Sequence, residues 1–187
     1  MAAPFSRGRK GVTARFSAGE AELLRDLAGQ LVELLADRSA ESAGSADPDE
    51  GDVLLAQLGI GGARSAPFDP AVARLLPDAY RGDDEAASEH RHLTERGLID
   101  RKVANAQAVI ATLESAAGAL DDNQVQSWLR TLTDLRLTIA ARLEIEQDGD
   151  EGRIETDADF ALQAAYDWLG YLQGTLIDVL ETGLADR

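Results

Sequence analysis

The stretch DDNQVQSWLRTLTDLRLTIAARL, residues 121–143, decides the fold of this chain. Its first residues, Asp121 and Asp122, are suited to accept the free backbone amides at the start of a helix. Apolar side chains then recur at helical spacing, at Val125, Trp128, Leu129, Leu132, Leu135, Ile139 and Leu143. Such a stripe is typical of a long helix that packs one face against other helices.

The neighbouring stretches have the same character. A helix is predicted from Asp83 or Asp84 to about residue 117, with Ile99, Val103, Ala106, Ile110 and Leu113 as its buried stripe. A loop is expected over residues 147–152, and a last helix from Asp157 to about residue 182. Asp69 and Pro70 form the start signal of a short helix that Pro77 stops.

The N-terminal part begins with a hairpin and continues into a helix. Val12, Ala14 and Phe16 alternate with polar residues, as in a half-buried strand, and Phe5 belongs to its partner strand. Ser17 and Glu20 have the spacing of a capping box, which opens a helix that ends near Asp37. Residues 38–52 are too polar to bury and predict a flexible acidic linker.

These elements predict an all-α fold, a multi-helix bundle with a short N-terminal β-hairpin and an acidic flexible linker. We expect one helical domain over residues 1–187, with residues 1–16 as hairpin and basic arm, since 187 residues can bury a sizeable core.

The inventory of reactive side chains is short. The chain has no cysteine, which excludes thiol nucleophiles, disulfides and iron–sulfur clusters. Its two histidines, His90 and His92, would lie about 200° apart on a helix and could not bind one ion together. We therefore expect no metal site, no cofactor and no enzymatic activity.

The charge of the chain limits its partners. The formal net charge is -16 and the isoelectric point is near 4.4, which opposes attraction to nucleic acid or to an anionic membrane. No apolar run approaches the roughly 20 residues that a membrane span needs, and no secretory signal is visible. These features predict a cytoplasmic protein without a membrane partner.

The first residues are the exception to this acidity. Arg7, Arg9, Lys10 and Arg15 are basic, and no acidic residue precedes Glu20. This arm is a candidate for contact with nucleic acid. Two other interpretations are a solvated hairpin and an arm that lies against the acidic body of the same molecule.

Arg136 is a charged residue within an apolar stripe. It lies about 40° from Leu132 on the helical wheel, so its guanidinium needs a carboxylate or carbonyl partner. A structural buried ion pair with Asp78 or Asp167 is the main prediction, with Asp83 as a further candidate. The alternative is capture of a ligand or phosphate by Arg136.

The last predicted helix has two uncharged stripes. Leu162, Ala165, Tyr166, Leu169, Leu172, Leu176 and Leu180 form the expected core stripe, and Phe160, Ala164, Trp168, Tyr171 and Thr175 form a second one. Either this helix is central and buried on both sides, or the second stripe is a protein-binding surface. Phe160, Trp168 and Tyr171 are the candidate partner-binding residues, because aromatic residues dominate binding energy when exposed.

Several of these stretches resemble a known family. They are Arg74–Tyr80 (RLLPDAY), Asp83 and Asp84, Trp128, Leu135–Leu137 with Arg142 and Leu143, and Tyr166–Gly170 (YDWLG). The chain is similar, over about residues 4–180, to an actinobacterial family of domains of unknown function that is often encoded near the Clp protease adaptor.

The resemblance implies a role in regulation. Some members of that family are oxidative-stress transcriptional regulators that act with a sigma factor and are switched by a Cys-x-x-x-Cys disulfide. That switch cannot operate in a chain without cysteine. The resemblance implies a regulator whose partner is a sigma factor or another transcription component.

Three functional hypotheses follow. The first is a non-enzymatic regulatory module that binds a protein, such as a sigma factor or RNA polymerase; a homodimer is a separate expectation for its oligomeric state. The second is a transcriptional regulator that binds DNA through the basic arm. The third is a carboxylate-based enzyme with Arg136 in its site.

Overall fold

The computed structural model describes residues 3–8, 11–44, 61–80, 82–115, 119–147, 149–150 and 152–185. The helices of this part are α1 (Ala18–Gly44), α3 (Pro70–Leu75), α4 (Asp84–Glu114), α5 (Asp122–Arg142) and α6 (Asp157–Ala185). The strands are β1 (Phe5–Gly8), β2 (Gly11–Ala14) and β3 (Ala119–Leu120). The predicted helical bundle with an N-terminal β-hairpin is confirmed. None of the helices in these residues is both long and apolar enough to span a membrane.

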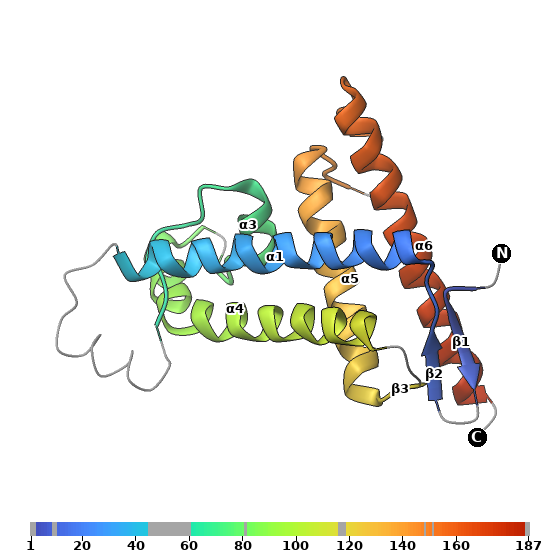
Figure 1. Ribbon diagram of the computed structural model, residues 1–187. Helices are drawn as coiled ribbons and strands as arrows, with labels where there is room; N and C mark the ends of the chain where they lie inside the picture. The colour runs from blue at the N-terminus through green and yellow to red at the C-terminus, as the bar shows by residue number, and fades with distance from the viewer. Residues whose placement is uncertain are drawn as a thin grey trace.

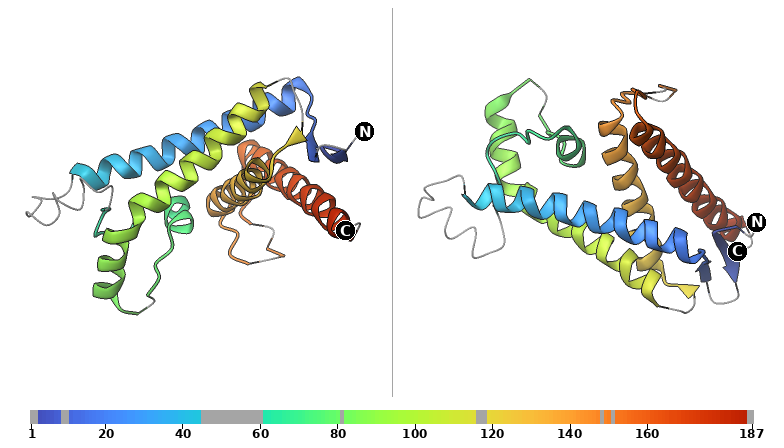
Figure 2. Two further views of the ribbon diagram at one scale, coloured as in Figure 1. Left: turned by 90° about the horizontal axis from the view of Figure 1, so that it is seen from below. Right: turned by 45° about the horizontal axis from the view of Figure 1, so that its top comes forward.

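Helix α5, which carries the apolar stripe with Leu132, Leu135 and Ile139, is the centre of the arrangement. It packs against α1, α3, α4 and α6. Helices α1 and α4 lie side by side as one pair, and α5 and α6 form a second pair that crosses the first (Figure 1, Figure 2). Leu132, Leu135 and Ile139 of α5 are buried, as the stripe predicted.

The predicted helix starts are confirmed by their hydrogen bonds. The amide of Ser17 donates to Glu20 Oε2 at 2.7 Å, and the amide of Glu20 donates to Ser17 Oγ at 3.3 Å. Asp121 and Gln124 form the same reciprocal pair at the start of α5, at 2.8 and 2.9 Å. Each pair satisfies amides that a helix start otherwise leaves without a partner.

The hairpin is fixed to the helices by a third strand and by aromatic packing. Strand β1 pairs antiparallel with β2, with Phe5 opposite Ala14, and β2 pairs antiparallel with β3 through Val12 and Leu120. The rings of Phe5 and Phe16 each lie 5.4 Å from the Trp128 ring of α5. Strand β3 was not predicted, because two residues are too few to show a period.

The predicted linker is wrong in its first seven residues. Helix α1 continues through Gly44, so residues 38–44 are helical. The physical reason is tertiary: Arg38 is 5% exposed and forms an ion pair with Glu95 of α4, and Ser42 Oγ donates to Glu95 at 3.2 Å. The rest of the predicted linker, residues 45–52, lies outside the described residues.

Candidate functional site

Among the described residues, helix α6 packs against its neighbours on one side only. Leu169, Leu172 and Leu176 are completely buried at helical spacing, and the helix packs against α5 and β1. It therefore lies at the edge of the molecule, as Figures 1 and 2 show. The alternative of a central helix buried on both sides does not agree with this position.

The opposite side of α6 carries exposed aromatic rings. Phe160 is 62% exposed and Tyr171 is 57% exposed. Ala164, between them on the same face, is also exposed, whereas Trp168 at the edge of the stripe is half-buried and packs against the core. We call Phe160, Ala164 and Tyr171 the α6 outer face. Of the three predicted partner-binding residues, the structure places Phe160 and Tyr171 on this face.

The charge of α6 has one sign. Residues 157–185 contain no lysine, arginine or histidine. Asp167 and Asp178 are exposed on the same side as the α6 outer face. An apolar strip bordered by carboxylates is suited to a partner surface that is apolar at its centre and basic at its rim.

Arg136 lies between α5 and α6 and binds neutral groups. Its Nη1 donates to Gln173 Oε1 at 2.9 Å, its Nη2 donates to Tyr166 Oη at 3.2 Å, and its Cζ lies 4.8 Å from the centre of the Tyr166 ring. Gln173 Nε2 in turn donates to Thr133 Oγ1 at 2.8 Å. The Arg136 Nε is buried without a partner among the described residues. This network connects the two helices by hydrogen bonds and a cation–π contact.

The predicted ion pair of Arg136 is not what the structure shows. Asp78 pairs with Arg91 of α4, and Asp167 is exposed and accepts from Gln163 Nε2 at 3.2 Å. The stacking on Tyr166 and the two neutral acceptors take the place of a carboxylate. The enzyme hypothesis requires a pocket that gathers Arg136, His92 and two acids. The structure instead places His92 Nδ1 2.8 Å from the carbonyl oxygen of Gly62, while Arg136 binds Gln173 and Tyr166 between α5 and α6. The arrangement on which the enzyme hypothesis depended is therefore not formed.

The basic arm is described only in part. Arg7 on β1 and Arg15 after β2 are exposed, and Arg9 and Lys10 lie outside the described residues. Arg15 follows the strand that pairs with β3, so its backbone position is fixed by the sheet. No group of three or more metal-binding side chains occurs in the described part of the chain.

Sequence reasoning missed a buried polar cluster between α1 and α4. Glu95, which is 3% exposed, accepts from Arg38 Nε at 3.0 Å and from Arg38 Nη2 at 3.1 Å. Arg38 Nη2 also donates to the carbonyl oxygen of Ser65 at 2.7 Å. The signal was present in the sequence: Glu95 lies four residues before Ile99, so the predicted buried stripe extends through it.

A second arginine, Arg91 of α4, holds the same segment as Arg38 of α1. Arg91 donates from Nη1 to the carbonyl oxygen of Arg64 and from Nε to Asp78 Oδ1, the latter at 3.1 Å. Gly62 lies so close to the helix that a Cβ there would be 2.8 Å from the Glu95 Cβ. The segment around Gly62–Ser65 is thus held against α4 by side chains that bind its carbonyl groups.

One more charged pair is buried between α4 and α5. Lys102 Nζ donates to Asp134 Oδ1 at 2.6 Å. Burial raises the pKa of Asp134, and the hydrogen bond and charge of Lys102 oppose that shift only in part. Folding thus strengthens proton binding at this carboxyl, which gives the pair a defined pH dependence.

We expect the stabilisation that Asp134 contributes to decline as the pH rises. A raised pKa means that the folded state binds the proton more tightly than the unfolded state, so the contribution is largest below the ordinary carboxyl range. Urea unfolding of the wild type and Asp134→Asn from about pH 3.5 to pH 7 checks this. The free energy of unfolding of the wild type minus that of the variant should fall over this range. A difference that stays flat or rises would contradict the expectation.

The comparison with protein families adds the identity of the family. A family described as a domain of unknown function, DUF2017, matches residues 2–180. The chain belongs to the DUF2017 family. This match covers every described helix and strand up to residue 180 of α6, including the α6 outer face.

Relatives of this DUF2017 chain have names that refer to regulation. It is 35% identical over 180 residues to proteins named oxidative stress regulator AosR from Mycobacterium tuberculosis and Mycobacterium bovis, covering 86% of this chain and 78% of the relatives. A Mycobacterium leprae relative is 32% identical over 175 residues, covering 84% of this chain and 77% of the relative. No solved structure matches the chain. The names of these relatives point to a regulatory role.

Proposed function

We propose that this DUF2017 protein is a non-enzymatic regulatory module of the cytoplasm that binds a protein partner through the α6 outer face. The observation that carries the proposal is the exposure of Phe160 and Tyr171 on a helix whose opposite side buries Leu169, Leu172 and Leu176 completely. Exposed aromatic residues on a rigid helix contribute strongly to protein binding, because they bury large areas at low entropic cost. The names of the relatives support a regulatory role.

A component of the transcription machinery, such as a sigma factor or RNA polymerase, is the partner class that the family resemblance favours. The acidic side chains beside the α6 outer face would attract a basic rim on such a partner. The net charge of -16 argues against DNA as the main partner, since phosphates repel such a surface.

Site-specific photo-crosslinking in the native host tests this proposal. A photoreactive phenylalanine analogue in place of Phe160 or Tyr171 should crosslink one and the same protein, identified by mass spectrometry. The matched control positions are Leu23 of α1 and Leu93 of α4, which are also exposed apolar residues. We expect no crosslink to that protein from the control positions.

Affinity measurements with the identified partner then give the size of the effect. Phe160→Ser/Tyr171→Ser should weaken binding by roughly 30-fold or more, the range of interface hot spots. The free energy of unfolding should change by less than about 1 kcal/mol, since both side chains are exposed. Unchanged affinity, or crosslinks only to a second copy of the chain, would contradict the proposal.

A further inference from the structure

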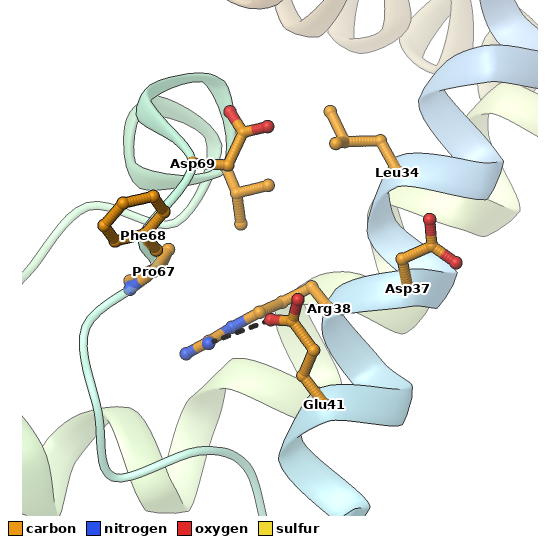
Figure 3. A pocket seen from close by; sticks show the side chains of 8 residues that line it. Leu34, Asp37, Arg38, Glu41, Pro67, Phe68 and Asp69 are labelled. Atoms are coloured by element: carbon orange, nitrogen blue, oxygen red, sulfur yellow. Dashed lines mark ion pairs between the residues drawn. The ribbon is translucent and has the colours of Figure 1, made fainter.

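A groove separates the second half of α1 from the start of α3. It has a volume of about 190 Å³ and is lined on the α1 side by Leu34, Asp37, Arg38 and Glu41 and on the other side by Pro67, Phe68, Asp69 and Val72. Figure 3 shows these side chains arranged around the space between the two elements. We call it the α1–α3 groove. Small-molecule pockets usually measure about 300–1,000 Å³, so this groove is of a size for one side chain.

The groove has an apolar base and an exposed aromatic wall. Val72 is buried and Leu34 is half-buried, so both present methyl groups rather than polar atoms. Phe68 is completely exposed and contributes nothing to the core. A solvent-exposed phenyl ring next to apolar methyl groups provides a surface for the stem of a long side chain or for a planar cation.

The uncompensated charge in the groove is negative. Asp37 has no ion pair or hydrogen bond within the described residues, and Glu41, 71% exposed, lies 3.7 Å from Arg38 Nη1. The charge of Arg38 is matched by Glu95 at 3.0 Å, which leaves the two α1 carboxylates without a full counter-charge. The third acid, Asp69, is paired with Arg142 at 2.7 Å.

Asp69 stabilises one side of the groove, and because it is paired with Arg142 it adds no unpaired negative charge. Burial works to raise the pKa of Asp69, but hydrogen bonds from Arg142 and from the Ala71 and Val72 amides lower it overall. Asp69 is therefore ionised, caps α3 and fixes the start of this helix next to Phe68. The groove is thus preformed on its α3 side.

We propose that the α1–α3 groove binds an arginine side chain of a protein partner, its methylene stem on Leu34 and Val72 and its guanidinium between Asp37 and Glu41 beside the Phe68 ring. A planar guanidinium suits both the carboxylates and the aromatic face. Residues 45–60, which follow α1, contain no lysine or arginine and four acidic residues, so that segment does not supply the cation. The inference rests on the proposed function only in that the partner is a protein.

The test uses small probes on the full chain and does not need the partner. N-acetyl-argininamide is titrated into the protein while the methyl signals of Leu34 and Val72 and the ring signals of Phe68 are followed by NMR. We expect saturable shifts at these three residues. N-acetyl-citrullinamide, the neutral isostere, should bind more weakly, by up to about fivefold, because it lacks the charge that the carboxylates attract.

Matched variants test which side chains bind the arginine probe. Asp37→Asn/Glu41→Gln should abolish the preference for the arginine probe over the citrulline probe, and Phe68→Ala should weaken binding of the arginine probe about two- to fivefold. Glu22→Gln/Asp26→Asn removes the same charge near the start of α1 and should leave the titration unchanged.

Two results would overturn the inference. They are equal binding of the two probes by the wild type, and a preference for the arginine probe that persists in Asp37→Asn/Glu41→Gln. The Phe160→Ser/Tyr171→Ser variant separates this inference from the proposed function, since it should lose the partner and still bind the arginine probe. Loss of probe binding in that variant would also count against the α1–α3 groove as the site.

Discussion

Replacement of Arg38 by methionine is expected to lower the free energy of unfolding by about 3–5 kcal/mol, the cost of leaving a buried charge unpaired. Glu95 is 3% exposed and receives two hydrogen bonds from Arg38, so the variant leaves its carboxylate without its main counter-charge. The carbonyl oxygen of Ser65 also loses its donor. Urea unfolding of the wild type and Arg38→Met measures the difference.

Two further variants distinguish the stability contribution of the buried Arg38–Glu95 pair from that of the exposed Arg38–Glu41 pair. Glu41→Gln removes the ion pair of Arg38 with an exposed acid at 3.7 Å and should cost less than about 1 kcal/mol. Arg38→Met/Glu95→Leu removes both buried charges and should recover most of the loss, because no unpaired charge stays in the interior. If Arg38→Met costs no more than Glu41→Gln, the pair does not hold α1 to α4.

Replacement of Trp128 by alanine is expected to cost about 3–5 kcal/mol, as for other large buried aromatic residues. The indole ring is 1% exposed and contacts the Phe5 and Phe16 rings at 5.4 Å, and its Nε1 donates to Thr112 Oγ1 at 3.0 Å. Its loss leaves a cavity beneath the hairpin. Denaturant unfolding gives the stability, and hydrogen exchange of the β1 and β2 amides should become faster.

The second tryptophan is the matched control for this prediction. Trp168 of α6 is half-buried, so Trp168→Ala should cost less than Trp128→Ala and leave exchange in β1 and β2 closer to that of the wild type. Thr112→Val keeps the Trp128 ring but removes the acceptor of its Nε1, at a cost of about 1–3 kcal/mol. Equal losses in the two alanine variants would mean that the aromatic contacts of Trp128 do not anchor the hairpin.

Local patterns in the sequence were sufficient for the helices and their starts. The period of Leu132, Leu135 and Ile139 identified α5, and the capping residues Ser17, Glu20 and Asp121 marked helix starts that the hydrogen bonds confirm. These features depend on residues within one or two turns of each other. For that reason they can be read from the chain alone.

The candidate site was predictable only in part. The second stripe of α6 was evident as Phe160, Trp168 and Tyr171, but helical spacing does not say whether a stripe meets another helix or solvent. The packing of α6 on α5 and β1 decided this, leaving Phe160 and Tyr171 exposed and Trp168 half-buried. The groove beside Phe68 was not predicted, because its two sides are distant in sequence.

Charged residues show most clearly which features could be predicted from the sequence and which could not. The sequence placed Arg136 inside a stripe and required a partner for it, but the partners are Tyr166 and Gln173 rather than an aspartate. Arg38, assigned to a linker, is instead held in a helix by Glu95, 57 residues away. Periodicity and capping depend on residues that are close in the chain, so they can be predicted from the sequence. The partner of a buried charge depends on which distant segments pack together, and only the tertiary structure decides that.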